Sequence, residues 1–179
     1  MIKITLPDGS VKEFASGVTP MEVAKSISEG FARNVISASF NGTTVETTTP
    51  LTTDGSLILY TWNDEDGKKA FWHSTSHVMA QVLEQMYPGI KLTLGPAIAN
   101  GFYYDVDFEE HKITEADFKK IEDRVLEISR GKHEFKLRPV SKADALELYK
   151  DNVYKTEMIT NLEDGTITFC DHDTFTDLC

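Results

Sequence analysis

The chain has 179 residues, of which 40% are hydrophobic and 26% charged, and its formal net charge is -11. These values are typical of an ordinary soluble globular protein of one large or two small domains. The negative net charge argues against strong non-specific binding of nucleic acid by this chain, because most of that affinity comes from Lys and Arg side chains that neutralise phosphates. No stretch approaches the ~20 consecutive apolar residues that span a bilayer, so we expect no membrane insertion.

The N-terminal segment and the two cysteines indicate that the protein is not secreted. Residues Met1–Leu6 alternate in polarity like a strand and lack the apolar core of a signal peptide. The two cysteines, Cys170 and Cys179, have no paired spacing of the kind found in disulfide frameworks. We therefore expect a cytoplasmic protein with reduced thiols.

Residues 1–62 are predicted to form a small α/β unit. Its expected elements are a hairpin around Pro7–Ser10, a helix over Pro20–Ser28, and strands over Val35–Phe40 and Ser56–Tyr60. Asn41-Gly42 is a strong turn signal after the first of these strands. The unit has no histidine, no cysteine and no glycine-rich phosphate loop. It is therefore interpreted as a binding or spacer module without catalysis.

The acidic stretch Asn63–Gly67 separates two apolar segments, and we place a domain boundary there. A helix follows, in which apolar residues recur at three- and four-residue intervals up to Met86, before the breaker pair Pro88-Gly89. Strands are predicted over Lys91–Leu94 and Phe102–Phe108.

A long helix is predicted over Glu115–Arg130, with Thr114 as N-cap and Gly131 as C-terminal breaker. Its apolar stripe is expected to pack in the core and consists of Phe118, Ile121, Val125 and Ile128. A strand over Glu134–Val140, a helix opened by Ser141 and a hairpin around Asp164-Gly165 complete the pattern. The sequence thus predicts an α+β domain over residues 63–179.

Two histidines four residues apart, His73 and His77, lie within the first helix of this domain. Residues at this spacing share one helical face, so both imidazoles can act on one small target. Chance alone gives roughly 0.14 such pairs in a chain with this histidine content, so the pair needs support from other motifs.

That support comes from further motifs in register with the histidine pair. They are Ile4-Thr-Leu-Pro-Asp-Gly-Ser10, Leu94-Gly-Pro96, Gly101-Phe-Tyr-Tyr-Asp-Val-Asp107, Val153-Tyr-Lys155 and Asp177-Leu-Cys179. With these motifs the chain resembles the N-terminal part of bacterial threonyl-tRNA synthetases over essentially its whole length. The family continues after the cysteine as Arg-Gly-Pro-His and then into an aminoacylation core, whereas this sequence stops at Cys179.

The resemblance implies a fold for each part. Residues 1–62 would be a TGS domain, which is a ubiquitin-like β-grasp module. Residues 63–179 would be an α+β editing domain of the second-additional-domain type found in threonyl- and alanyl-tRNA synthetases. Such a domain hydrolyses serine from tRNA specific for threonine, so this part of the threonine–tRNA ligase would be an ester hydrolase that cannot aminoacylate alone.

The resemblance also implies the site residues. His73 and His77 would position the water and the terminal ribose, with the choice of general base left open. Lys155 would stabilise negative charge on the ester oxygen, and Cys179, Tyr104 and Asp177 would line the pocket. The sequence also allows simpler interpretations, in which Lys155 is a solvated strand residue, Asp177 caps a turn and Cys179 is frayed. His111, His133, His172 and Cys170 match no family site residue and are interpreted as structural or exposed.

Two alternatives stay open. His73, His77 and Cys179 are suitable ligands for zinc, so a zinc-stabilised structural domain is one of them. The other is a non-catalytic module that orients the tRNA acceptor end. For editing, the resemblance implies no required cofactor and places ATP, Mg²⁺ and a further zinc in the absent core. The implied partner is the acceptor end of seryl-tRNA specific for threonine, and we expect a monomeric chain from a homodimeric parent enzyme.

Overall fold

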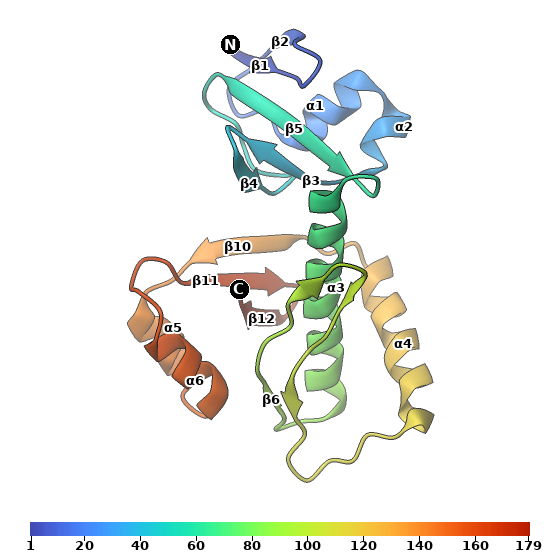
Figure 1. Cartoon of the computed structure of the whole chain (residues 1–179), viewed down its shortest axis with the longest axis vertical. Coiled ribbons are helices and arrows are strands. Elements are labelled where there is room, and N and C mark those ends of the chain that lie inside the picture. The colour runs from blue at the N-terminus through green and yellow to red at the C-terminus, as the bar shows by residue number, and fades with distance from the viewer. The chain divides into compact units, whose positions relative to one another are not determined.

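A computed structural model describes residues 1–179, which divide into two compact units, Met1–Phe71 and Trp72–Cys179. The elements that begin in the first unit are β1 (Ile2–Thr5), β2 (Val11–Phe14), α1 (Pro20–Ile27), α2 (Glu29–Ala32), β3 (Val35–Phe40), β4 (Thr43–Val45), β5 (Gly55–Thr61) and α3 (Glu65–Met86). The helix α3 continues into the second unit and supplies its central element (Figure 1).

The first unit is a five-stranded mixed sheet with the order β2-β1-β5-β3-β4. Strand β1 runs parallel to β5, and the other neighbours are antiparallel. Alternate residues of β1 face α1, so the core gathers Ile2, Ile4, Val23, Ala38, Leu51 and Leu57. A mixed sheet packed on a helix in this way is a β-grasp fold, as the resemblance implies.

Local signals set the helix and the turns of this unit. Thr19 caps α1, because its side chain accepts from the Glu22 backbone N–H while the Glu22 carboxylate accepts from the Thr19 N–H. Asn41 and Gly42 both have positive φ, at 51° and 81°. Such angles suit a tight two-residue hairpin, and these residues join β3 to β4.

The second unit contains three small sheets around α3. Its further elements are β6 (Lys91–Leu92), β7 (Ala97–Ile98), β8 (Gly101–Phe102), β9 (Val106–Asp107), α4 (Glu115–Arg130), β10 (Phe135–Pro139), α5 (Lys142–Leu148), α6 (Val153–Thr160), β11 (Thr168–His172) and β12 (Phe175–Leu178). The antiparallel sheet β10-β11-β12 is the largest of the three, and β6 pairs with β9 and β7 with β8.

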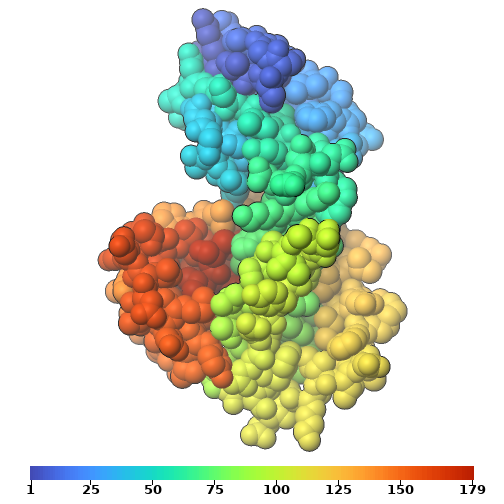
Figure 2. All heavy atoms as spheres, viewed as in Figure 1, coloured from blue at the N-terminus to red at the C-terminus, as the bar shows by residue number.

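Helix α3 is covered by apolar contacts on two sides. Val78 and Val82 pack against Ile128 of α4. Ala80 packs against Leu92 and Phe175, so that β6 and β12 are held close to the same helix. Figure 2 shows the C-terminal segment, in orange and red, lying against the yellow-green segment that follows α3. This packing brings widely separated parts of the sequence to the same part of α3.

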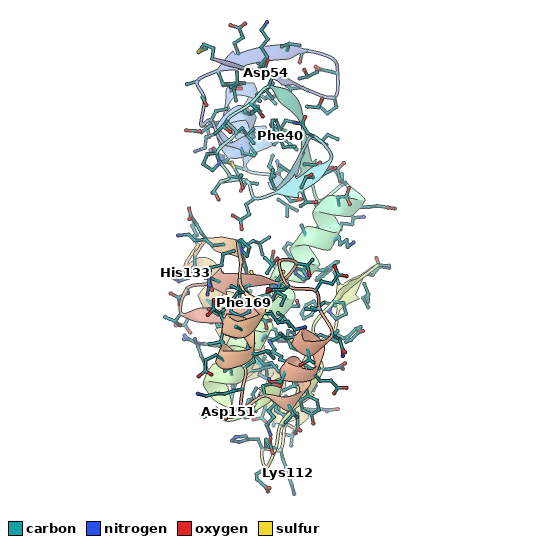
Figure 3. The ribbon with its side chains drawn as sticks, turned by 90° about the vertical axis from the view of Figure 1, so that its left-hand side faces the viewer. Phe40, Asp54, Lys112, His133, Asp151 and Phe169 are labelled. Carbon is teal, nitrogen blue, oxygen red and sulfur yellow. The ribbon has the colours of Figure 1, made fainter.

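A third apolar cluster joins α5, α6 and β11 through Ala145, Ile159 and Phe169. Phe169 is marked in Figure 3, well away from Lys112 at the tip of the loop between β9 and α4. Since α6 carries Lys155, this cluster fixes where that lysine side chain can reach.

Several sequence predictions for this unit are confirmed. Helix α4 begins and ends where the sequence predicts, with Thr114 and Asp117 forming a capping box. Ser141 caps α5 by accepting from the Asp144 N–H at 3.1 Å. Helix α3 ends at Met86, just before the breaker pair Pro88-Gly89.

Other predictions are wrong in detail. The predicted strand over Phe102–Phe108 is interrupted, because β8 and β9 pair with different partners. Phe118 is 53% exposed and does not belong to the buried stripe of α4. Asp164-Gly165 is a turn between α6 and β11, and the hairpin turns instead at Asp173, which has φ of 54°. No helix combines the length and the apolar character needed to cross a membrane.

Candidate functional site

The six predicted site residues are brought together in the second unit from four separate segments. His73 and His77 lie one turn apart on α3, and Lys155 lies on α6. Tyr104 lies between β8 and β9, and Asp177 and Cys179 belong to β12 and its end. The contacts of α3 with β12 and of α6 with β11 place these segments around one point.

A chain of polar contacts runs through the imidazoles. His77 Nδ1 lies 2.8 Å from Asp177 Oδ2, and its Nε2 lies 3.1 Å from His73 Nε2. His73 Nε2 in turn lies 3.2 Å from the Sγ atom of Cys179. The side chains of a carboxylate, two imidazoles and a thiol therefore form one connected row.

Asp177 is the centre of the site. Its side chain is about as buried as that of Lys155, with both residues 1% exposed. The Asp177 carboxylate accepts hydrogen bonds from Tyr104 Oη at 2.7 Å, from the backbone N–H of Leu178 at 2.9 Å, and from the Lys155 ammonium. A buried charge needs such partners, because the loss of hydration costs several kcal/mol per ion.

These contacts set the protonation states of the pair Asp177 and His77. Burial raises the pKa of Asp177, but the His77 and Lys155 partners outweigh it and lower this pKa to about 2. Burial lowers the pKa of His77, but the hydrogen bonds that His77 makes to Asp177 and Cys179 outweigh it and raise this pKa to about 9. Near neutral pH, Asp177 is therefore a carboxylate and His77 an imidazolium.

Tyr104 stays a hydrogen-bond donor. Burial, with the Asp177 charge as the next cause, raises the pKa of its phenol far above the ordinary value. The neighbouring Tyr103 is 47% exposed. The structure therefore places Tyr104, not Tyr103, against the Asp177 carboxylate.

Cys179 is held in place at the end of β12. Its backbone N–H donates to the Thr168 carbonyl at 2.8 Å, which differs from the expectation of a frayed residue. Loss of hydration raises the pKa of the thiol, but the two histidines, His73 first, outweigh it and lower the pKa to about 6. A thiolate is therefore favoured at neutral pH, next to two imidazoles.

Lys155 also differs from its simplest sequence interpretation. It lies in the first turn of a helix, not in a strand, and it is buried. Asn152 caps that helix, since its Oδ1 accepts from the Lys155 N–H at 3.1 Å while its Nδ2 donates to the Leu92 carbonyl at 2.8 Å. The cap thus ties the start of α6 to β6.

Gly95 explains one of the sequence motifs in physical terms. A Cβ atom added at Gly95 would collide with the ring of Tyr104. Its carbonyl also lies 2.8 Å from the Ser76 hydroxyl, which is 2.7 Å from the His73 carbonyl. A side chain at this position would therefore displace Tyr104 from Asp177.

The remaining histidines and the second cysteine lie outside this cluster. His111 and His133 are exposed, whereas Cys170 and His172 are buried. His172 Nδ1 lies 2.8 Å from Gln81 Oε1, and burial lowers the pKa of its imidazole. A neutral His172 ring that donates to the buried Gln81 amide has a structural role, which agrees with the interpretation from the sequence.

The ligand types of the site suit a zinc ion. The ligand atoms of His73, His77 and Cys179 all lie within 4.8 Å of one another. Ligands of a tetrahedral zinc are about 3.3 to 3.6 Å apart, given Zn–N and Zn–S bonds of ~2.0 and ~2.3 Å. The Asp177 partner of His77 resembles the carboxylates that orient zinc-bound imidazoles. These three residues are the ones that would hold the metal, with small side-chain movements.

Comparison with known proteins gives one matching domain family and several similar proteins. Residues 2–61 match the TGS domain family. The full chain is 86% identical over 179 residues to the threonine–tRNA ligase of Flavobacterium johnsoniae and 83% identical over 179 residues to that of Flavobacterium psychrophilum. It is 51% identical over 181 residues to the threonine–tRNA ligase of Parabacteroides distasonis.

In each comparison the match covers 100% of this chain but 28% of the relative. The matched part is the N-terminal part of these relatives. The chain therefore carries a TGS domain at its N-terminus and corresponds, over its whole length, to the N-terminal region of bacterial threonine–tRNA ligases.

Proposed function

We propose that the chain is part of a cytoplasmic threonine–tRNA ligase and that its second unit is an editing domain of the second-additional-domain type. The reaction is hydrolysis of the ester between serine and tRNA specific for threonine. Aminoacylation, with its ATP, Mg²⁺ and zinc, lies in regions beyond this chain. The proposal draws on the names of the relatives and on the cluster around Asp177. The TGS domain is assigned no catalysis.

The chemical need for such a reaction is clear. Serine lacks only one methyl group of threonine, and one methyl group discriminates by only ~1 to 3 kcal/mol in a binding pocket. A ligase specific for threonine therefore attaches some serine to its tRNA. A second site that hydrolyses the wrong ester restores fidelity.

The row of imidazoles supports a mechanism of water attack. Water adds to the ester carbonyl carbon, and His73 accepts the proton that the water loses, because His77 is already protonated near neutral pH. The bond between the carbonyl carbon and the ribose oxygen then breaks, and the same histidine returns the proton to the ribose oxygen. The products are serine and uncharged tRNA. Because His73 Nε2 lies beside both His77 and Cys179, we place the attacking water near these three side chains.

Asp177 and Lys155 support this chemistry by orientation and charge. Asp177 holds His77 through Nδ1, so that Nε2 is directed at His73. The Lys155 ammonium compensates the buried carboxylate, and its positive charge favours the negative charge that develops on the ester oxygen. Tyr104, which donates to Asp177, and Cys179, which lies beside His73, would contact the aminoacyl group or the adenosine.

The decisive experiment measures hydrolysis of seryl-tRNA and threonyl-tRNA, both made with tRNA specific for threonine. It compares the 179-residue chain and a longer protein that contains it, each as wild type and with His73→Ala and His77→Ala together. His111→Ala is the matched control, since the His111 side chain lies at the Pro88 carbonyl and the ring of Tyr87, just after the end of α3. Selective loss of serine that the double variant abolishes supports the proposal; no hydrolysis by any protein rejects it.

A second candidate is a zinc-stabilised structural domain. The observation in its favour is the close grouping of His73, His77 and Cys179. Metal analysis of protein purified without a histidine tag tests this candidate. One zinc per chain, with loss of the folded state on chelation, favours it, whereas metal-free protein with an unchanged melting temperature rejects it.

A further inference from the structure

We infer that Tyr149 is a positioning residue of this site, which holds the Lys155 ammonium in place beside the Asp177 carboxylate. The inference rests on the proposed function of the site. Tyr149 lies at the end of α5, outside all the sequence motifs that indicate the site. Three contacts support the assignment.

The first contact is between the aromatic ring and the ammonium. Lys155 Nζ lies over the ring of Tyr149, 4.7 Å from its centroid. A cation over an aromatic face is attracted by the ring quadrupole, and the attraction grows when water is excluded. Lys155 is 1% exposed, so its ammonium has little water to replace this contact. The Tyr149 ring thus gives the Lys155 ammonium a second favourable partner, in addition to the Asp177 carboxylate.

The second contact is between the hydroxyl and the strand that carries Asp177. Tyr149 Oη donates to the carbonyl of Thr176 at 3.1 Å. Thr176 directly precedes Asp177, so this bond limits how far the carboxylate can move along with its strand. The ring edge also packs against Phe169 of β11, with centroids 5.6 Å apart.

The third contact is between the Tyr149 backbone and the helix that carries Lys155. The Tyr149 carbonyl accepts from the Asn152 N–H and from the Thr156 hydroxyl, each at 2.8 Å. Tyr149 therefore contacts both elements of the ion pair at once. Loss of the ring would let the ammonium move, and the orientation of Asp177 and of its partner His77 would loosen with it.

The test uses two substitutions at Tyr149 and one control. Tyr149→Phe keeps the ring and removes the hydroxyl, whereas Tyr149→Leu removes the ring. Tyr154→Leu is the control, because Tyr154 neighbours Lys155 in sequence but donates to Asp107 on another element. Circular dichroism of each variant establishes that it is folded at the assay temperature.

The first readout does not depend on activity. In the chain labelled with ¹³C at the lysine ε-carbon, the Lys155 signal is the one that Lys155→Arg removes. We expect the Tyr149 ring to shift this signal in the wild type. The shift should remain in Tyr149→Phe and Tyr154→Leu and should disappear in Tyr149→Leu. An unshifted signal in the wild type, or one that Tyr149→Leu leaves in place, overturns the inference.

The second readout is hydrolysis of seryl-tRNA specific for threonine. We expect kcat to fall about tenfold in Tyr149→Leu, with KM changed less than about twofold, and to recover in Tyr149→Phe. Equal loss in both variants would overturn the role of the ring. If neither the 179-residue chain nor the longer protein hydrolyses the ester while the wild type shows the expected Lys155 signal, the proposed function is rejected and the positioning role stays supported.

Discussion

At the scale of single residues, the site is organised by one buried carboxylate. Asp177 contacts the side chains of Tyr104, Lys155 and His77. A buried carboxylate and a buried ammonium each depend on the other, because removal of one leaves an uncompensated charge in a medium that solvates it poorly. The stability of this unit should therefore respond to these two residues in a coupled way.

Asp177→Asn is expected to lower the free energy of unfolding by about 3 to 5 kcal/mol, because the Lys155 ammonium stays buried without its anion. Adding Lys155→Met should restore part of this loss. Urea unfolding near neutral pH measures both effects. Glu147→Gln, which breaks an exposed pair with Lys150, is the control and should change little. A double variant no more stable than Asp177→Asn would contradict the coupling.

His172 gives a prediction for pH. Its pKa is lowered by burial first and by the neighbouring His133 charge second, while Asp173 opposes them. As the pH falls through the ordinary pKa of 6.5, the His172 side chain therefore takes up a proton in the unfolded chain before it does so in the folded chain. The stability that the neutral His172 contributes is therefore fully present above pH 6.5 and is lost as the pH falls towards the lowered pKa.

We expect the free energy of unfolding to decrease as the pH drops from about 7 to about 5, and His172→Gln to reduce this dependence. Urea unfolding at several pH values measures the slope for each protein. His111→Gln is the control, since His111 is exposed. A slope that His172→Gln leaves unaltered would assign the acid sensitivity to other groups.

At the scale of elements, the short helices depend on partners beyond their own sequences. Helix α6 covers only eight residues, which is too short to be stable alone. Asn152 caps its N-terminus, and the Lys142 ammonium donates to the carbonyls of Thr160 and Leu162 at its C-terminus, at 2.7 and 2.9 Å. A cation at this end also interacts favourably with the helix dipole.

Lys142→Met is expected to lower the stability of the second unit by about 1 to 2 kcal/mol, because the terminal carbonyls of α6 lose a charged donor. Thermal unfolding followed by circular dichroism measures the change. Lys136→Met is the matched control, since Lys136 is an exposed lysine whose contact with Glu134 is 4.0 Å long. Equal effects of the two substitutions would argue against a specific role at the helix end.

At the scale of the whole molecule, charge limits what the chain can bind alone. The net charge is -11, and residues 63–179 carry 14 basic and 23 acidic side chains. Such a chain repels a polyanion at long range, so any contact with tRNA is local. Most of the affinity of the longer relatives for tRNA should then come from their remaining parts.

The 179-residue chain is therefore expected to bind tRNA specific for threonine weakly and with a shallow dependence on salt, because it neutralises few phosphates. Filter binding over a range of salt concentrations measures both quantities, with a longer protein that contains this chain as the reference. Tight binding by the short chain with a steep salt dependence would contradict the prediction.

Local sequence signals alone set most of the elements. Thr19 with Glu22, Thr114 with Asp117, and Ser141 are caps that act within one turn, and Asn41-Gly42 needs no distant partner. The helical spacing of His73 and His77 likewise fixes their common face. Their meaning as a site came from motifs in register with a known family, because two histidines carry little information alone.

The three-dimensional packing was needed for what depends on contacts between distant residues. The burial of Lys155, its pairing with Asp177 and the ring of Tyr149 beside it follow from how α6 packs on β11 and β12. The exposure of Phe118 and the interruption between β8 and β9 arise in the same way. Caps and turns act over one to four residues, whereas a buried charge is compensated by whichever side chain the fold brings within about 4 Å.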